Sequence, residues 1–240
     1  MKQPKAVIFD VGGTLFTDGD FHTFEAIEAL RLAADNPDAT STKSLFEISM
    51  DLLKRIKQAD TNGIDIKLAA IIENVINRAG LEYSTDLESL AILFDSINCS
   101  ERAIIPNINE LLNTLEQEGI RTAVISNTVM SGIQMKAAIE RHIPNNNFEF
   151  VFTSADFIFK KPYSDIFEAA LMKTGLKAED CWYCGDSFAN DVVGSSSVGM
   201  YPIHYNASSK KPVEFIEKDN LNYCAVNDWT QLIKIIIEKN

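Results

Sequence analysis

The sequence has few basic residues and no long apolar run, and these absences exclude several classes of protein. Its 240 residues include 22 lysines and arginines against 34 aspartates and glutamates, which gives a net charge of −12. Such a chain has no basic field to attract nucleic acid or an anionic membrane surface. No apolar run approaches the roughly 20 residues of a membrane span, and the apolar segment near the N-terminus is too short for a signal peptide. We therefore expect a cytoplasmic protein with no nucleic-acid or membrane partner.

Cysteine is also scarce, with four residues in the whole chain. In a chain of this length these thiols fit reduced residues of a core better than a disulfide framework. Cys181 and Cys184 have the spacing of redox and zinc sites, but the segment around them is typical of a β-strand. Residues three apart in a strand point to opposite faces of the sheet, and no second Cys/His pair at metal spacing accompanies them. The two cysteines are therefore not predicted to form a site.

A short apolar run near the start, residues 7–9, is followed at once by Asp10 and then by Gly12 and Gly13. Apolar runs bounded by turn signals suit strands of a parallel sheet that is buried on both faces. A carboxylate just beyond such a strand lies in the crevice where open α/β sheets bind ligands. Glycine lets the backbone turn tightly and come close to a ligand. Asp10 is therefore a candidate site residue, although a strand followed by a plain turn has the same pattern.

Residues 21–97 have a different character from the rest of the chain. Apolar residues recur there at spacings of three and four, in four successive segments separated by turn signals, and no convincing strand interrupts them. This periodicity is typical of amphipathic helices. From about residue 101 onward, predicted strands and helices alternate, which indicates βαβ units around a parallel sheet. The strands are predicted at 7–9, 120–126, 148–154, 181–186, 200–206 and 222–226.

These patterns together predict an α/β fold. We expect residues 1–16 and 98–240 to form a doubly wound parallel sheet with helices on both faces, and residues 17–97 to form an inserted, all-helical cap domain. One helix is expected at 190–199, and the last helix at 228–239. Nothing in the sequence indicates an oligomer, so we take the chain as a monomer.

Polar residues end three of the predicted strands. Asp10, Ser126 and Asp186 follow their apolar runs, and Lys161 lies in a loop before the last of these strands. Right-handed crossovers place the carboxyl ends of parallel strands at one edge of the sheet, so these four side chains are expected to meet. Two carboxylates, a hydroxyl and an ammonium suit a hard metal ion and a phosphate. Mg²⁺ binds one or two carboxylates with waters and substrate oxygens, and a carboxylate can attack phosphorus to form an aspartyl-phosphate.

Four segments of the chain resemble the motifs of the haloacid dehalogenase superfamily, in the branch whose helical cap follows the first motif (the C1 cap, subfamily I). They are FDVGGTL at 9–15, VISN at 124–127, KKPYSDIF at 160–167 and GDSFANDVVGSSSVGM at 185–200. The segments occur in the family's order and with its spacing, and they span nearly the whole chain. The resemblance implies a Rossmann-like core and a Mg²⁺-dependent hydrolase of the phosphatase type, which acts on a small phosphorylated or otherwise anionic substrate.

The resemblance also implies a metal site. Asp10 would be the nucleophile and a Mg²⁺ ligand, and the backbone carbonyl of Gly12 would be a second ligand. Asp186 would bind the metal directly. Asp191 would belong to the same metal site, in support of its ligands.

A phosphate site is implied beside the metal. Ser126, with backbone N–H groups around Gly13 and Asn127, would hold the transferring phosphoryl oxygens. Lys161 would neutralise the charge between the Asp10 nucleophile and the phosphate, which otherwise repel each other. The helical cap would close over the site and exclude water.

Gly12 departs from the family's usual pattern, D-x-D-G-T, in which the third position is a second aspartate. That aspartate is the general acid that protonates the leaving oxygen and then activates water. Metal binding would survive its loss because the backbone carbonyl is the ligand, but the proton transfer, worth ~10²–10⁴-fold in rate, would not. Either another group replaces it or the substrate has a good leaving group. Asp18, Asp20 and His22 lie close in sequence, at the entry to the cap.

Two alternatives stay open at this stage. Family members that cleave C–P bonds carry a small residue at this position and use a cap lysine, for which Lys43, Lys54, Lys57 and Lys67 are candidates. Dehalogenases of the family also lack the second aspartate, but they do not keep a metal-binding motif like GDSFAND, which disfavours carbon–halogen hydrolysis. The second alternative is a non-catalytic phosphate-binding or interaction protein, and the presence of all the other site residues argues against it.

Overall fold

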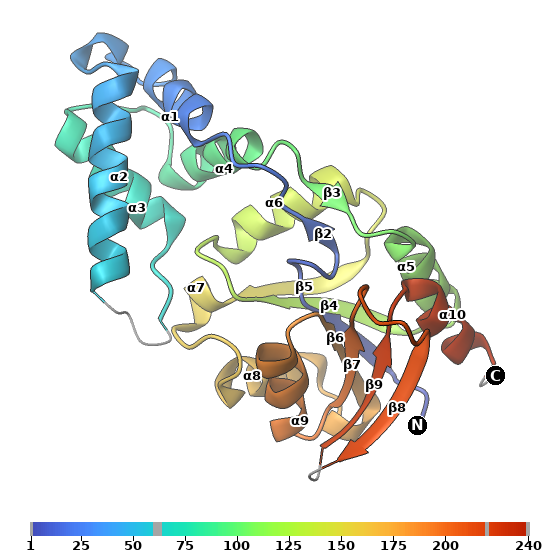
Figure 1. Cartoon of the computed structure of the whole chain (residues 1–240). Coiled ribbons are helices and arrows are strands. Elements are labelled where there is room, and N and C mark those ends of the chain that lie inside the picture. Colours follow the sequence, from blue (N-terminus) through green and yellow to red (C-terminus); the bar gives the residue numbers. More distant parts are fainter. Residues whose placement is uncertain (1, 60–63, 219–220, 239–240) are drawn as a thin grey trace.

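The computed structural model describes residues 2–59, 64–218 and 221–238. Its main feature is a seven-stranded sheet with the strand order β5-β4-β1-β6-β7-β9-β8 (Figure 1). Neighbouring strands are parallel, except that β8 runs antiparallel to β9 at one edge. The predicted parallel sheet is therefore confirmed, with one antiparallel edge strand in addition. The strands are β1 Ala6–Phe9, β4 Arg121–Ser126, β5 Phe148–Thr153, β6 Cys181–Gly185, β7 Tyr201–Tyr205, β8 Val213–Lys218 and β9 Leu221–Val226.

Helices cover both faces of the sheet because its central strands are apolar on both faces. Successive residues of β1 point to opposite faces. Val7 and Phe9 pack in one cluster with residues of α5, α6 and α10, whereas Ile8 packs in a second cluster with residues of α8. Cys181 and Cys184 lie in opposite clusters as buried free thiols, which agrees with strand alternation. The helices are α5 Ile108–Gln117, α6 Gly132–His142, α8 Ser164–Thr174 and α10 Trp229–Ile237.

Four further helices stand beside the sheet, at the upper left of Figure 1. Their buried apolar residues, which include Leu45 and Leu90, form a cluster separate from those of the sheet. In the described part of 21–97 there is no strand, only an isolated bridge between Ile64 and Phe159. The predicted turn at 61–63 lies outside the described residues, and the exact limits of the cap stay a prediction. The helices are α1 Thr23–Leu32, α2 Thr42–Gln58, α3 Leu68–Ala79 and α4 Leu87–Asn98, with a 3-10 turn at Pro37–Ala39.

Several local features differ from the predicted elements. Strands β2 Phe16–Thr17 and β3 Ala103–Ile104 form a small antiparallel sheet where the chain enters and leaves the cap. The helix expected at 190–199 is a π-helix, Phe188–Val193, followed by the short α9, Gly194–Ser197. A short helix, α7 Ser154–Phe157, follows β5, and a 3-10 turn, Ala178–Asp180, precedes β6. The helices of the described chain include none with the length and apolar character that a membrane span requires.

Candidate active site

The carboxyl ends of three neighbouring strands bring predicted site residues to one edge of the sheet. Strand β1 lies between β4 and β6. Asp10 follows β1, and its N–H donates to the Cys184 carbonyl at 2.8 Å. Ser126 is the last residue of β4, and Asp186 follows β6. The structure therefore brings these three positions together, as the strand endings predict.

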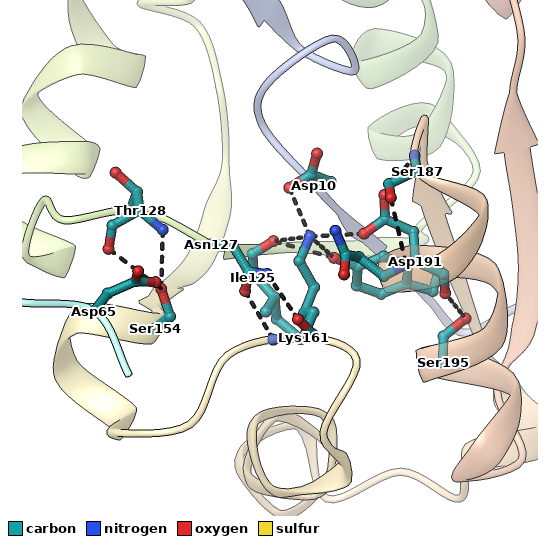
Figure 2. A network of polar contacts seen from close by, with 12 residues as sticks. Asp10, Asp65, Ile125, Asn127, Thr128, Ser154, Lys161, Ser187, Asp191 and Ser195 are labelled. Carbon is teal, nitrogen blue, oxygen red and sulfur yellow. Dashed lines mark hydrogen bonds and ion pairs between the residues drawn. The ribbon is translucent and has the colours of Figure 1, made fainter. Parts of the chain in front are cut away.

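Lys161 is buried at the centre of this edge, with 2% of its side chain exposed. Its Nζ donates to Oδ1 of Asp10 at 2.6 Å and to Oδ1 of Asp191 at 2.7 Å (Figure 2). Burial lowers the pKa of Lys161, but the two carboxylates outweigh this effect and raise the pKa above its usual value. The ammonium therefore stays charged and holds the Asp10 carboxylate in one orientation.

Tyr183, on β6, supports Lys161 from within the core. Its hydroxyl accepts a hydrogen bond from the Lys161 ammonium at 2.9 Å and donates to the Ile125 carbonyl at 3.1 Å. Burial raises the pKa of Tyr183 well above its usual value, so the phenol stays protonated. The sequence did not indicate this contact, because a tyrosine within the run CWYC looks like any residue of a buried strand.

Three carboxylates converge beside Lys161. One oxygen each of Asp10, Asp186 and Asp191 lies within 4.8 Å of the other two. Burial raises the pKa of Asp10, and burial together with the charge of Asp10 raises the pKa of Asp186. When all three are ionised, the single ammonium of Lys161 leaves the group net negative, and a divalent cation would compensate that charge. Because the donor set is all oxygen, as Mg²⁺ prefers, the residues present fit this ion.

Asp191 differs from the other two carboxylates, because both of its oxygens have a partner within the protein. Oδ1 accepts from Lys161, and Oδ2 accepts the Ser187 N–H at 2.9 Å. Its side chain is 1% exposed, whereas Asp186 is an exposed residue. The π-helix Phe188–Val193 carries Asp191 into this buried position. Because both oxygens already have partners, Asp191 is better placed to orient Lys161 and the loop after β6 than to bind a metal ion directly.

The two glycines of the first loop have different surroundings. Gly13 has a φ of 69°, and a Cβ at this position would collide with the Asp186 carboxylate, so only glycine permits this approach. Its N–H donates to the Phe16 carbonyl at 2.9 Å, and this bond does not support the predicted contact of that N–H with a phosphate. Gly12 is exposed, and a Cβ added there would meet no atom within 4 Å. The position where the family's second aspartate would begin is therefore open.

Asn127 ties the loop after β4 to the loop of Lys161 through its side chain. Its Nδ2 donates to the Lys161 carbonyl at 2.9 Å, and the Lys161 N–H donates to its Oδ1 at 2.8 Å. The sequence predicted only a backbone contact for Asn127. The side-chain contact joins residues 34 positions apart, and no local pattern indicates such a pairing.

Ser126 is 4% exposed at the end of β4. A serine in this position commonly caps the next helix. Here the next helix, α6, is capped by Ser131 in a capping box with Gln134. Ser126 therefore does not cap α6, and its contact with a phosphoryl oxygen stays a prediction.

The candidates for a replacement acid or a cap nucleophile have other partners. Asp18 accepts from Arg102 at 2.8 Å, and His22 lies 3.1 Å from Glu101. Lys67 forms an ion pair with a core carboxylate at 2.9 Å. These contacts direct the three side chains to partners other than Asp10. The remaining candidates are exposed: Asp20 beside the cap entry, and Lys43, Lys54 and Lys57 on α2.

Comparison with known proteins places the chain in a family. The family model of haloacid dehalogenase-like hydrolases matches residues 4–199. A glyceraldehyde 3-phosphate phosphatase of Methanothermobacter thermautotrophicus is 26% identical over 233 residues, which cover 97% of this chain and 99% of that protein. A ribulose-1,5-bisphosphate 5-phosphatase of Halopiger xanaduensis is 25% identical over 212 residues, which cover 85% of this chain and 86% of that protein.

A solved structure agrees as well. The 2-haloacid dehalogenase of Pseudomonas syringae pv. Tomato has a TM-score of 0.59 and 21% identity, and the match covers 100% of both chains. At this identity the likeness shows the fold alone. The family model, in contrast, matches most of the chain, and the matched residues include Asp10, Ser126, Lys161 and Asp186. The chain therefore belongs to the haloacid dehalogenase-like hydrolases.

Proposed function

We propose that this hydrolase is a Mg²⁺-dependent phosphatase that acts on a small phosphorylated metabolite through an aspartyl-phosphate on Asp10. The observation that carries the proposal is the buried Lys161 ammonium between Asp10 and Asp191. A carboxylate nucleophile and a phosphate repel each other, and an ammonium beside both reduces that repulsion. Two relatives that are named phosphatases and align with most of this chain support the same class of reaction. A small phosphorylated metabolite is also in keeping with the cytoplasmic location that we propose.

The reaction would take place in two steps. In the first, an oxygen of Asp10 attacks phosphorus, an O–P bond forms, and the bond from phosphorus to the leaving oxygen breaks. Ser126 would hold a phosphoryl oxygen, and Lys161 would compensate the charge of the phosphoryl group. The leaving oxygen departs either as an alcohol, with a proton taken from solvent, or as a carboxylate, which needs none. Water then attacks phosphorus in the second step, which releases inorganic phosphate and restores the Asp10 carboxylate.

The metal site of the proposal consists of Asp10, the Gly12 carbonyl and Asp186, with Asp191 in the supporting position that its buried contacts suit. When bound, Mg²⁺ supplies a Lewis acid that stabilises the charge on the phosphoryl oxygens. Because Gly12 has no carboxyl group, the leaving oxygen has no acid at the usual position. We therefore expect acyl and aryl phosphates, whose leaving groups need little protonation, to react faster than alkyl phosphates.

Turnover with a defined set of substrates tests the proposal. The set contains acetyl phosphate, p-nitrophenyl phosphate, and triose and pentose phosphates, each with Mg²⁺. We expect phosphate release that falls by at least about 10³-fold in Asp10→Asn, since the amide is not a nucleophile. Chelation by EDTA should abolish the activity and Mg²⁺ should restore it. Asp51→Asn, on the surface of α2, is the matched control; absence of Asp10-dependent turnover of every substrate would overturn the proposal.

A further inference from the structure

A second cluster of polar contacts joins the cap to the loops of the site. Asp65 lies between α2 and α3, and its Oδ2 accepts a hydrogen bond from the Ser154 hydroxyl at 2.6 Å (Figure 2). Its Oδ1 lies 3.6 Å from Nζ of Lys160. The Asp65 side chain is 19% exposed, and Ser154 is fully buried. One carboxylate of the cap therefore contacts both ends of the core segment 154–160, which leads from β5 to Lys161.

Ser154 links Asp65 to the loop that follows β4. Its Oγ accepts the Thr128 N–H at 2.9 Å, and its own hydrogen is donated to Asp65. Thr128 directly follows Asn127, and Ser126 precedes both. A serine hydroxyl has a single hydrogen, and a charged acceptor makes the stronger bond. Without Asp65 the hydrogen would turn to the Thr128 carbonyl, 3.2 Å away, and the loop would lose the link to the cap that runs through Ser154.

The segment 157–160, which leads into Lys161, also depends on the cap. Ile158 has a φ of 68°, a left-handed conformation that is rare for a β-branched residue, and the residue is 61% exposed. A strained position of this kind persists only where the surroundings hold it. Two contacts from the cap hold the segment 157–160 in place. Ile64 forms an antiparallel bridge with Phe159, and Asp65 pairs with Lys160. The next residue carries the ammonium of the site.

Two further contacts belong to the same cap segment, residues 64–68. Lys67 pairs with Asp156 at 2.9 Å, and Asp156 also accepts the Gly132 N–H at 2.7 Å. The Leu68 N–H donates to the Val129 carbonyl at 2.7 Å. The segment therefore lies against both loops of the core. The Asp65 side chain reaches the first loop through Ser154 and pairs with Lys160 in the second.

We propose that Asp65 is a positioning residue, which makes the arrangement of the Ser126–Asn127 loop and of the Lys161 loop depend on the seating of the cap. Through Ser154 it holds the first loop, and through Lys160 it holds the second. The phosphate site is then complete only when segment 64–68 is in place, so that phosphoryl transfer is confined to the closed, water-excluding arrangement. This inference rests on the proposed function, because it concerns the same phosphate site.

Variants at Asp65 and Ser154 test the proposal, with Asp51→Ala as a matched control that removes an exposed carboxylate of α2. We expect Asp65→Ala to lower kcat for the best substrate by about 10²-fold, the effect of misplaced reacting groups, and to weaken the binding of inorganic phosphate in the presence of Mg²⁺. Asp51→Ala should change both by less than about twofold. Asp65→Asn keeps an oxygen for the Ser154 hydroxyl and should restore part of kcat.

The double variant Asp65→Ala/Ser154→Ala separates a coupled pair from two independent effects. If Asp65 acts through Ser154, the double variant is no slower than the slower single variant. The proposal is overturned if Asp65→Ala matches Asp51→Ala in kcat and in phosphate affinity, or if the two single effects simply add. Failure of the proposed function is a separate result, since it is absence of Asp10-dependent turnover in the wild type; calorimetric binding of inorganic phosphate still tests Asp65 in that case. A wild type that shows no Asp10-dependent turnover and also binds no phosphate overturns both.

Discussion

Gly12 is the residue at which this site departs from its family, and the structure leaves room for the missing group. A Cβ at this position would meet no atom within 4 Å, and the residue is exposed. Its neighbour Gly13 is the opposite case, since a Cβ there would collide with Asp186. A side chain is therefore tolerated at one of these two adjacent glycines and excluded at the other.

Gly12→Asp is expected to raise kcat for alkyl phosphate esters by about 10²-fold, the lower end of what general acid–base catalysis contributes. Gly12→Asn occupies the same space without an acidic proton and should bring no such rise. The gain should be confined to esters, because the leaving group of acetyl phosphate needs no acid. Steady-state kinetics on an alkyl phosphate ester and on acetyl phosphate measure this gain. Equal kcat values of Gly12→Asp and Gly12→Asn for the ester would contradict the idea that Gly12 leaves the site without its general acid.

Single residues were predictable where a short motif ends a strand. The positions of Asp10, Ser126 and Asp186 follow from three apolar runs and the rule that parallel strands share an edge. The contacts of Asn127 and Tyr183 with Lys161 were not predictable, because they depend on how side chains from separate elements are directed. The same holds for Asp191, whose buried oxygens became evident only from the π-helix that carries it.

At the scale of elements, helix α10 supports the loop after β1 from the other end of the chain. Trp229 is fully buried, and its Nε1–H donates to the Thr14 carbonyl at 3.1 Å. Asp228 caps the helix by accepting the Thr230 N–H at 2.8 Å, and it also accepts from Nδ2 of Asn107 at 3.0 Å. The start of α10 is therefore fixed both to α5 and to the turn that contains Gly12 and Gly13.

Asp228 gives the stability of this helix a pH dependence. Burial raises the pKa of Asp228, but its hydrogen bonds with Thr230 and Asn107 outweigh burial and lower the pKa below the usual value. A group with a lowered folded-state pKa stabilises the protein above its unfolded-state pKa, and this contribution is lost as pH falls through the folded-state pKa. Asp228→Ala should therefore lower the free energy of unfolding by about 1 kcal/mol at neutral pH. The difference in the free energy of unfolding between the wild type and Asp228→Ala should shrink below about pH 4.

Thermal unfolding of wild type and Asp228→Ala from pH 7 to pH 3 measures this difference. Asp38→Ala, at an exposed position in the 3-10 turn of the cap, is the control and should leave the midpoint unchanged over the same range. If the unfolding midpoints of the wild type and Asp228→Ala differ by the same amount down to pH 3, the charge of the Asp228 carboxylate does not contribute to the difference in stability.

Elements were predictable where their apolar period is long and regular. The amphipathic helices and the buried parallel strands follow from the periods 3.6 and 2 in the sequence. Strand β8 and the pair β2–β3 were not predicted, because their pairing partners decide their conformation. The π-helix at Phe188–Val193 was also not predicted, since its pattern is the same as that of an ordinary helix.

At the scale of the whole molecule, the two segments that connect cap and core meet at a buried guanidinium. Arg102 is 3% exposed at its side chain and bonds both oxygens of Asp95 in α4, at 2.9 and 3.0 Å. It also bonds Asp18, in the segment that enters the cap, at 2.8 Å. Its guanidinium lies 4.8 Å from the centroid of the Phe16 ring, on β2. The entry and the exit of the cap are thus held by one residue.

Arg102→Met should lower the free energy of unfolding by about 3–5 kcal/mol, because it leaves the buried Asp95 carboxylate without its main partner. Arg55→Met removes a cation from an exposed pair with Asp51 and should cost no more than about 0.5 kcal/mol. Urea unfolding of both variants measures the two losses. Equal losses would show that the buried pair contributes no more than a surface pair.

The sequence by itself determined the fold class, the helical insertion and the edge of the sheet at which the candidate site residues meet. It did so because these properties depend on local apolar periods and on residues that directly follow a strand. Only the tertiary structure decided which side chains support the site: Asp65 contacts Ser154 across 89 residues, Asp18 contacts Arg102 across 84, and Trp229 contacts Thr14 across 215. The physical reason is that a hydrogen bond between distant residues requires both elements to be packed first, and local patterns carry no information on where two such side chains will meet.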